Sequence, residues 1–140
     1  MNDIRISFLL CVFNDEPFIE ETIESILNQS YNNFELIIVN DGSTDKTIEI
    51  INSFDDDRIQ LYSKQNSGLA DSLNFGLDKC SGEWIARIDG DDICSLDRIE
   101  EQVKHISDEV AVIGSFVDII DENGDAISQL TSLPLEHSDI

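Results

Sequence analysis

The sequence predicts an α/β fold, Rossmann-like, with a mostly parallel sheet flanked by helices and a C-terminal β-hairpin. Short apolar runs alternate with helical patterns, the connections between them are short, and Asn123-Gly124 separates two apolar runs near the end. Repeated βα units favour parallel strands, because a crossover helix brings the chain back to the same end of the sheet. Asn-Gly between apolar runs is typical of a two-residue hairpin turn.

The first half of the chain contains two βα units. Residues 4–13 are almost continuously apolar, as expected for a strand that is covered on both faces. A helix with Pro17 in its first turn is then indicated by the spacing of Ile19, Ile23, Ile26 and Leu27. Residues 34–39, "FELIIV", predict the second buried strand, and the next helix is marked by Ile48, Ile51 and Phe54.

The second half continues the alternation and then changes. Strands are predicted at 58–63 and 83–88, with a helix between them whose packing stripe is Leu69, Leu73, Leu77 and Cys80. A helix over 97–107 and a fifth strand at 110–114 follow, and the hairpin occupies the region after 115. The tail "TSLPLEHSDI" has no partner element, so we expect a truncated fold.

Length and charge restrict the functional classes. The 140 residues suit a single domain, 1–140, and the net charge of −22 disfavours nucleic acid and anionic membrane surfaces as direct partners. Three cysteines without CxxC spacing suit reduced thiols. No signal peptide or membrane span is recognised, so we expect a cytoplasmic protein, with the inner face of the membrane as an alternative location for the full-length chain.

Polar clusters follow three of the predicted strands, at Asn14-Asp15, at 40–43 and at 89–92. Ligands of open parallel sheets bind outside the carboxyl ends of the strands, so these clusters together indicate a site. Asp89 and Asp91, with Gly90 between them, can direct two carboxylates toward one hard cation. Oxygen ligands favour Mg²⁺, Mn²⁺ or Ca²⁺ over zinc.

Three other functions match the residues less well. A calcium-binding hand is rejected, because Cys94 stands where that loop needs glycine. A glycine-rich phosphate loop is absent. A phospho-acceptor receiver domain stays open as a minor alternative, although Ser63-Lys64 ends the third strand where an acceptor aspartate is needed.

The chain resembles the N-terminal, nucleotide-sugar-binding part of family 2 (GT-A fold) inverting glycosyltransferases. Four segments carry the resemblance in order: "ISFLLCVFND" with the helix after it, "FELIIVNDGSTDKT", "NSGLADSLNFGLDKCSGEWIARIDGDDICSLDRIEEQ" and "VIGSFVDIIDENG". It extends over residues 4–127, and the second and third segments are specific in combination. One departure concerns the end of the first strand, where the family often has Pro-Thr-Tyr-Asn and this chain has 11–14, "CVFN".

The resemblance implies a role for each matching residue. Phe13 would lie against the base of the donor, and Asp41 would accept a hydrogen bond from that base. Asp89 would reach the ribose or support the metal, and Asp91 would ligate Mg²⁺ or Mn²⁺ at the diphosphate. Gly90 would belong to the same donor-binding turn.

The resemblance also implies the reaction. A sugar would pass from a nucleotide diphosphate, most simply a UDP-sugar, to the hydroxyl of a saccharide or lipid-linked acceptor in bacterial surface polysaccharide synthesis. The general base is expected beyond Ile140, so this chain alone would be inactive. A catalytically silent nucleotide-binding or assembly module of the same fold is the alternative. Truncation also leaves open a homodimer through the strands of 110–133.

Overall fold

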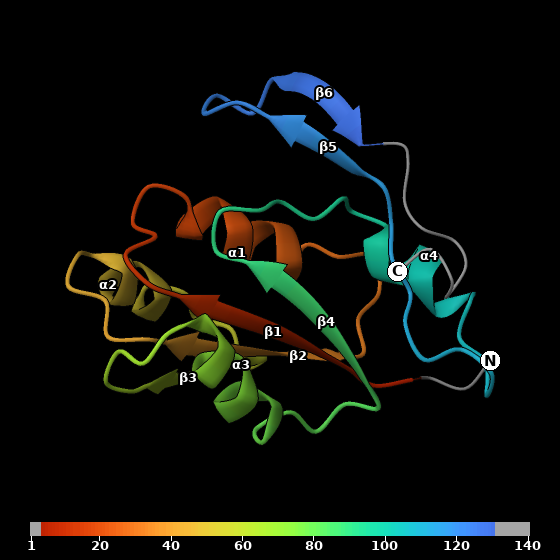
Figure 1. The fold of residues 1–140 in the computed structure, drawn as a ribbon, viewed down its shortest axis with the longest axis horizontal. Coiled ribbons are helices and arrows are strands. Elements are labelled where there is room, and N and C mark those ends of the chain that lie inside the picture. The colour runs from red at the N-terminus through yellow and green to blue at the C-terminus, as the bar shows by residue number, and fades with distance from the viewer. Residues whose placement is uncertain (1–3, 131–140) are drawn as a thin grey trace. The chain divides into compact units, whose positions relative to one another are not determined.

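The computed structural model describes residues 4–130, which form four helices and six strands (Figure 1). In chain order these are β1 (Ile6–Val12), α1 (Ile19–Leu27), β2 (Phe34–Asn40), α2 (Thr47–Asn52), β3 (Ile59–Ser63), α3 (Leu69–Leu77), β4 (Trp84–Asp89), α4 (Arg98–Val103), β5 (Val117–Ile120) and β6 (Ala126–Leu130). The chain divides into two compact units, Met1–Lys104 and His105–Ile140. The first carries the sheet and helices, and the second carries the β5–β6 hairpin.

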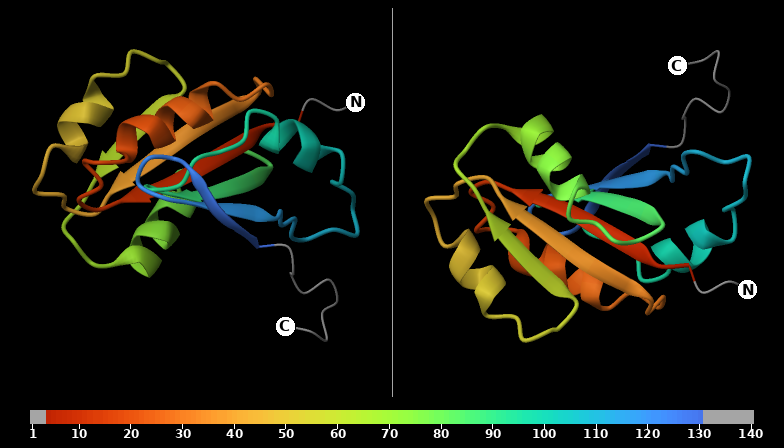
Figure 2. Two further views of the ribbon diagram at one scale, coloured as in Figure 1. Left: turned by 90° about the horizontal axis from the view of Figure 1, so that it is seen from above. Right: turned by 90° about the horizontal axis from the view of Figure 1, so that it is seen from below.

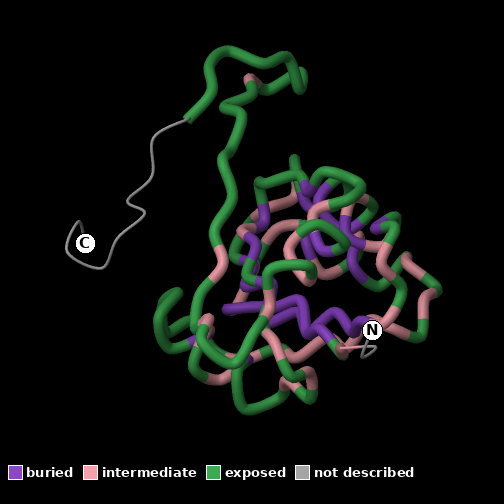
Figure 3. The backbone as a smooth tube through the Cα atoms, turned by 90° about the vertical axis from the view of Figure 1, so that its right-hand side faces the viewer, coloured by how far each residue is buried: buried purple, intermediate pink, exposed green. Residues whose placement is uncertain are grey.

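The first unit is built on a parallel sheet with the strand order β3-β2-β1-β4. Every residue of β1 and β2 is buried, which explains why both strands are almost continuously apolar in sequence. Figure 3 colours the buried parts of the backbone purple. The chain steps outward from β1 to β3 and then returns to the other side of β1 as β4. The strand order therefore reverses between β1 and β4, and the predicted parallel α/β architecture is confirmed.

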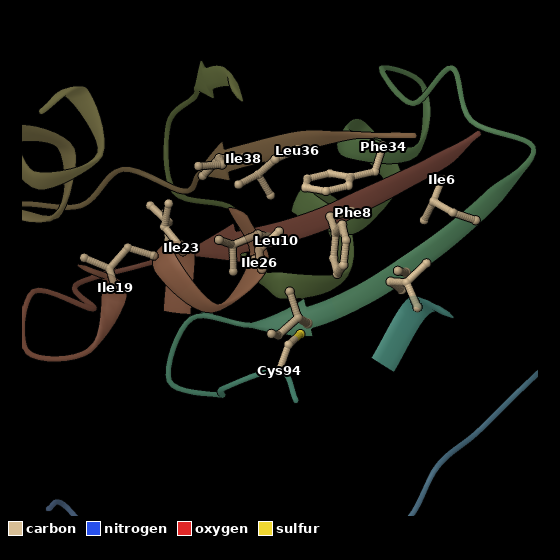
Figure 4. Close-up of a cluster of buried hydrophobic side chains, with 14 of the residues drawn as sticks. Ile6, Phe8, Leu10, Ile19, Ile23, Ile26, Phe34, Leu36, Ile38 and Cys94 are labelled. Atoms are coloured by element: carbon tan, nitrogen blue, oxygen red, sulfur yellow. The ribbon is translucent and has the colours of Figure 1, made fainter. Parts of the chain in front are cut away.

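The larger core lies on the face of the sheet covered by α1, α2 and α4 (Figure 2). Alternate residues of the central strands point into it, and Ile19, Ile23 and Ile26 of α1 meet them at helical spacing (Figure 4). The side chains from the two central strands are Ile6, Phe8, Leu10, Val12, Phe34, Leu36 and Ile38. Burying each large apolar side chain contributes roughly 1.5–3 kcal/mol, so this face supplies most of the folding energy.

Among the helices of the described residues, α3 alone covers the opposite face. Leu9, Cys11, Ile37 and Val39 pack there against Leu73 and other residues of the helix. The expected stripe is only half correct, because Leu69 and Leu77 are 50% and 47% exposed. The helix instead turns its small residues, Ser72 and Gly76, to the sheet and so comes closer to it than a leucine stripe would permit.

A buried carboxylate ties the amino ends of the strands together on this second face. Glu35 of β2 accepts hydrogen bonds from the Ser7 hydroxyl at 2.5 Å, the Ser81 amide at 2.6 Å and the Gln60 amide group at 3.1 Å. Burial would raise the pKa of Glu35, but hydrogen bonds from Ser7, Ser81 and Arg5 outweigh it and lower the pKa from 4.5 to about 2. Glu35 thus fixes the sheet at the end remote from the strands' carboxyl termini.

Two predictions for residues 97–114 were wrong. The helix ends at Val103 rather than 107, and residues 110–114 form no strand. Val112 in that segment is 85% exposed, and neither sheet of the described residues includes it. An apolar run becomes a strand only where a neighbour receives its hydrogen bonds, and residues 110–114 pair with no other strand in the part of the chain described.

The predicted hairpin is present in the second unit, with a different turn. β5 and β6 pair antiparallel, and Asp121 N–H donates to Asp125 O at 2.9 Å, which leaves three residues in the loop rather than two. Gly124 N–H donates to Asp121 O at 3.0 Å and Gly124 has φ 84°, so a tight turn is followed by a glycine bulge. The expected homodimer involves residues up to 133, of which 131–133 lie outside the described range.

Candidate active site

The polar residues singled out in the sequence gather at the carboxyl edge of the parallel sheet. Cys11 pairs with Asp89 and Val12 pairs with Asn40, so β1, β2 and β4 end side by side. Phe13, Asp41 and the 89–92 turn follow directly from these paired positions. The reversal of strand order between β1 and β4 lies beneath them, where ligands of such sheets bind.

The turn after β4 packs closely against the end of β1. The Asp92 amide donates to Asp89 O at 3.2 Å, and Gly90 O accepts a hydrogen bond from the Thr22 hydroxyl of α1 at 2.9 Å. A Cβ atom on Gly90 would lie 2.5 Å from Oδ2 of Asp15, so a larger residue at this position would require the Asp15 side chain to move. The glycine of the predicted motif therefore admits a third carboxylate, Asp15, to the turn.

Carboxylates dominate the electrostatics of this turn. Burial raises the pKa of Asp15, and the charges of Asp91 and Asp89 raise it further. The pKa of Asp92 is raised by burial and then by the same two neighbours. Arg87 and Arg98 supply nearby positive charge that opposes this rise for Asp92, and the Arg87 guanidinium lies 2.5 Å from Oδ1 of Asp89 on the surface. A bound cation would relieve the remaining repulsion.

The side chains at this turn would supply only part of the coordination of a hard cation. Asp89 and Asp91 supply carboxylate oxygens, the ligands that Mg²⁺ and Mn²⁺ prefer. Within residues 4–130, no group of three or more His, Cys, Asp or Glu side chains converges closely enough to hold a metal. Such an ion would therefore complete its coordination with water and with oxygens of a ligand, as Mg²⁺ commonly does at phosphates.

Asp41 follows β2 and is withdrawn from solvent. Its Oδ1 accepts hydrogen bonds from the Lys64 ammonium at 2.6 Å and the Ser67 amide at 2.9 Å, and its Oδ2 accepts from the Gly68 amide at 2.8 Å. Burial would raise the pKa of Asp41, but these donors lower it below the ordinary value. Asp41 thus stays ionised and fixes the loop that leads from β3 into α3.

Phe13 lies at the rim of the same edge. Its side chain is 49% exposed, unlike every residue of the strand before it, and its amide donates to Oδ2 of Asp15 at 3.0 Å. The Asp41 amide donates to Val12 O at 2.9 Å. This hydrogen bond holds the backbone at Asp41 close to the backbone at Phe13. An aromatic ring that is left in solvent beside polar groups is suited to stacking on a planar ligand.

The sequence did not reveal two residues of this edge in these roles. The sequence places Lys64 only at the end of the third predicted strand, and in the structure its ammonium pairs with Asp41. Asp15 belongs to the polar cluster predicted after the first strand, and in the structure its carboxylate lies against Gly90. Position alone was the available signal, since both residues directly follow strands or turns at the carboxyl edge of a parallel sheet.

Fold and edge together define the class of protein. A parallel sheet with an acidic, partly aromatic edge at its topological switch point is typical of α/β domains that bind nucleotides. The chain belongs to glycosyltransferase family 2, whose sequence profile, "Glycosyl transferase family 2", matches residues 7–138. The predicted family is confirmed.

Curated relatives agree with this assignment. An uncharacterized glycosyltransferase of Haemophilus influenzae is 39% identical over an alignment 147 residues long, gaps included. The alignment covers 96% of this chain and 46% of that protein. Glycosyltransferase GlyA of Streptococcus pneumoniae is 37% identical over 106 residues, which cover 74% of this chain and 15% of that protein. The chain thus spans less than half the length of these relatives.

Solved structures confirm the GT-A fold. Residues 1–349 of Staphylococcus aureus TarS, in complex with UDP-GlcNAc, superimpose with a TM-score of 0.68 at 24% identity, covering 72% of this chain and 30% of that TarS chain. The mannosyltransferase PcManGT of Pyrobaculum calidifontis, in complex with GDP-Man and Mn²⁺, gives 0.69 at 24% identity, covering 76% of this chain and 33% of that one. Within residues 4–130, none of the helices has the length and apolar character needed to cross a bilayer.

Proposed function

We propose that residues 1–140 hold the donor-binding part of a metal-dependent, inverting glycosyltransferase that takes its sugar from a nucleotide diphosphate. One observation carries the proposal: Phe13, Asp41 and the 89–91 turn follow neighbouring strands at one carboxyl edge, beside the switch in strand order. In such a donor complex, the Phe13 ring would lie against the base and the buried carboxylate of Asp41 would bind the edge of the base. The carboxylates of the 89–91 turn would bind the metal at the diphosphate.

In this proposal the 89–91 turn receives the diphosphate. A Mg²⁺ or Mn²⁺ ion held by Asp91, with support from Asp89, would neutralise the negative charge that develops on the leaving nucleotide diphosphate. Gly90 keeps the turn close to Asp15, and that third carboxylate adds to the attraction for a cation. Without a cation, the same charges would repel a diphosphate.

The base of the donor would lie between Phe13 and Asp41. The Phe13 ring offers an exposed stacking face. The Asp41 carboxylate would accept the single imide N–H of uracil, because carboxylate oxygens only accept hydrogen bonds. The structural neighbours include complexes with both UDP-GlcNAc and GDP-Man, so the preference for uracil over guanine requires a direct binding test.

The acceptor half of the reaction is proposed from family membership. We expect transfer to a hydroxyl of a saccharide or lipid-linked acceptor of a bacterial surface polysaccharide, in the cytoplasm or at the inner face of the membrane. Inversion requires a general base to deprotonate that hydroxyl. We assign the base to sequence beyond Ile140 and expect donor binding, without transfer, from residues 1–140.

Titration of UDP by calorimetry, with and without Mn²⁺, tests the donor site. We expect binding that depends on Mn²⁺, is lost in Asp91→Asn and is retained in Asp57→Asn. Asp57 is a suitable control because it is exposed and precedes β3, so it lies at the opposite edge of the sheet. GDP in place of UDP tests the base, with weaker binding expected.

Two results would contradict the proposal. UDP binding that is equal in the presence and absence of Mn²⁺, and unchanged in Asp91→Asn, would remove the metal from the 89–91 turn. Absence of any UDP or GDP binding by the folded protein, with or without Mn²⁺, would remove the donor site itself.

A further inference from the structure

The residue after Phe13 has an unusual backbone conformation. Asn14 has φ 57° and is the only non-glycine residue with positive φ among residues 4–130. The left-handed region is unfavourable for residues with a Cβ atom, and asparagine tolerates it better than most. Strain of this kind persists only where surrounding contacts hold it, and it often occurs at functional sites.

The contacts that hold Asn14 come from the loop after β2. Asn14 N–H donates to the Ser43 hydroxyl at 3.0 Å, and Oδ1 of Asn14 accepts from the Thr44 amide at 2.8 Å. The backbone and the side chain of one residue therefore both bind the same loop. Ser43 is itself fixed, because its amide donates to Oδ1 of the buried Asn40 at 3.0 Å.

Further hydrogen bonds join the same two loops beyond Asn14. The Asp15 amide donates to the Thr47 hydroxyl at 2.9 Å, and the Glu16 amide donates to Oδ2 of Asp45 at 3.1 Å. Asp15 and Glu16 lie in the segment that follows Phe13, whereas Asp45 and Thr47 lie in the segment that follows Asp41. The two loops thus form one connected layer over the ends of β1 and β2.

We propose that Asn14 is a positioning residue for donor binding: its left-handed turn and its bond to Thr44 lock the loop of Phe13 to the loop of Asp41. The turn directs Phe13 out of the buried strand, so that its ring remains half exposed at the rim. The role rests on the proposed donor site, whereas the lock between the loops can be measured without any ligand.

Three variants separate the backbone from the side chain. Asn14→Gly keeps the left-handed turn at no steric cost but loses the acceptor for Thr44. Asn14→Ala loses both, and Asn14→Asp keeps an acceptor oxygen and the tolerance of positive φ. Asn28→Ala is the matched control, because Asn28 is exposed at the end of α1 with an ordinary φ of −85°.

Amide hydrogen exchange tests the lock directly. In Asn14→Ala we expect amide exchange at 14–16 and 43–47 to become roughly tenfold faster, because alanine is strained at positive φ and one hydrogen bond is lost. Exchange in β1 and β2 should not change. Asn14→Gly should show a smaller increase confined to the Thr44 side, and Asn28→Ala none in these loops. Unchanged exchange at 43–47 in Asn14→Ala would overturn the lock.

UDP affinity in the presence of Mn²⁺ tests the positioning role. We expect the dissociation constant to rise about tenfold in Asn14→Ala, less in Asn14→Gly and least in Asn14→Asp, in protein that remains fully folded. Looser loops with an unchanged dissociation constant would overturn the positioning role. Failure of the wild-type protein to bind UDP would instead refute the proposed function, and hydrogen exchange would still decide whether Asn14 locks the loops.

Discussion

The Lys64 ammonium lies 2.6 Å from Oδ1 of Asp41, and the two side chains are only 14% and 6% exposed. The same ammonium is 3.3 Å from Oδ2 of Asp71 in the first turn of α3. Lys64 therefore neutralises the buried carboxylate and fastens the loop between β3 and α3 to the end of β2. The geometry of this edge depends on a pair separated by 23 positions in the sequence.

Removal of Lys64 should leave a buried, uncompensated carboxylate. We expect Lys64→Met to lower the urea midpoint several times more than Lys104→Met, because the Lys104–Glu101 pair is exposed and screened by water. The double variant Lys64→Met/Asp41→Asn should recover part of the loss, since no charge then remains buried. Equal effects of the two lysine variants would show that the buried pair contributes no more than a surface pair.

Glu35 should make the stability of the protein sensitive to acid. Its folded pKa of about 2 lies below the ordinary 4.5, so its stabilisation is complete above pH 4.5 and is lost as the pH falls toward 2. A difference of that size corresponds to roughly 3 kcal/mol at neutral pH. Urea unfolding between pH 2.5 and 6.5 should show a weaker pH dependence in Glu35→Gln than in the exposed control Glu49→Gln.

Gly76→Ala should destabilise the contact between α3 and the sheet. The new Cβ would lie 2.4 Å from Cδ1 of Leu9 and 3.0 Å from Cγ2 of Val39, both in the core. Overpacking of this kind costs about 1–3 kcal/mol, and the better helix propensity of alanine offsets up to about 1 kcal/mol of it. Chemical denaturation should show no comparable loss in Gly114→Ala, whose Cβ would meet nothing within 4 Å.

Arg87 should compete with a metal for Asp89. The two side chains form an ion pair of 2.5 Å while 50% and 41% exposed. We expect Arg87→Gln to tighten Mn²⁺ binding about two- to fivefold, the range that corresponds to a surface ion pair. Lys104→Gln removes the same charge elsewhere, and an equal gain in that variant would attribute the effect to net charge rather than to release of Asp89.

The sequence alone determined the succession of β1 to β4 along the chain and the parallel α/β class. Predominantly apolar runs such as 34–39 indicate burial on both faces, and helical spacing follows each run within a few residues. The same logic located Asp41 and the 89–91 turn, because the carboxyl ends of parallel strands necessarily meet at one edge. Local patterns sufficed wherever the decisive interactions were local or periodic.

The tertiary structure decided what depends on partners far away in the chain. Residues 110–114 are apolar enough for a strand, but they pair with no other strand among the described residues. Lys64, Asp15 and Asn14 gain their roles only through contacts with Asp41, Gly90 and the 43–44 loop. A side chain's partner is set by how the strands lie beside one another, and strand order and register are properties of the folded sheet that no single segment encodes.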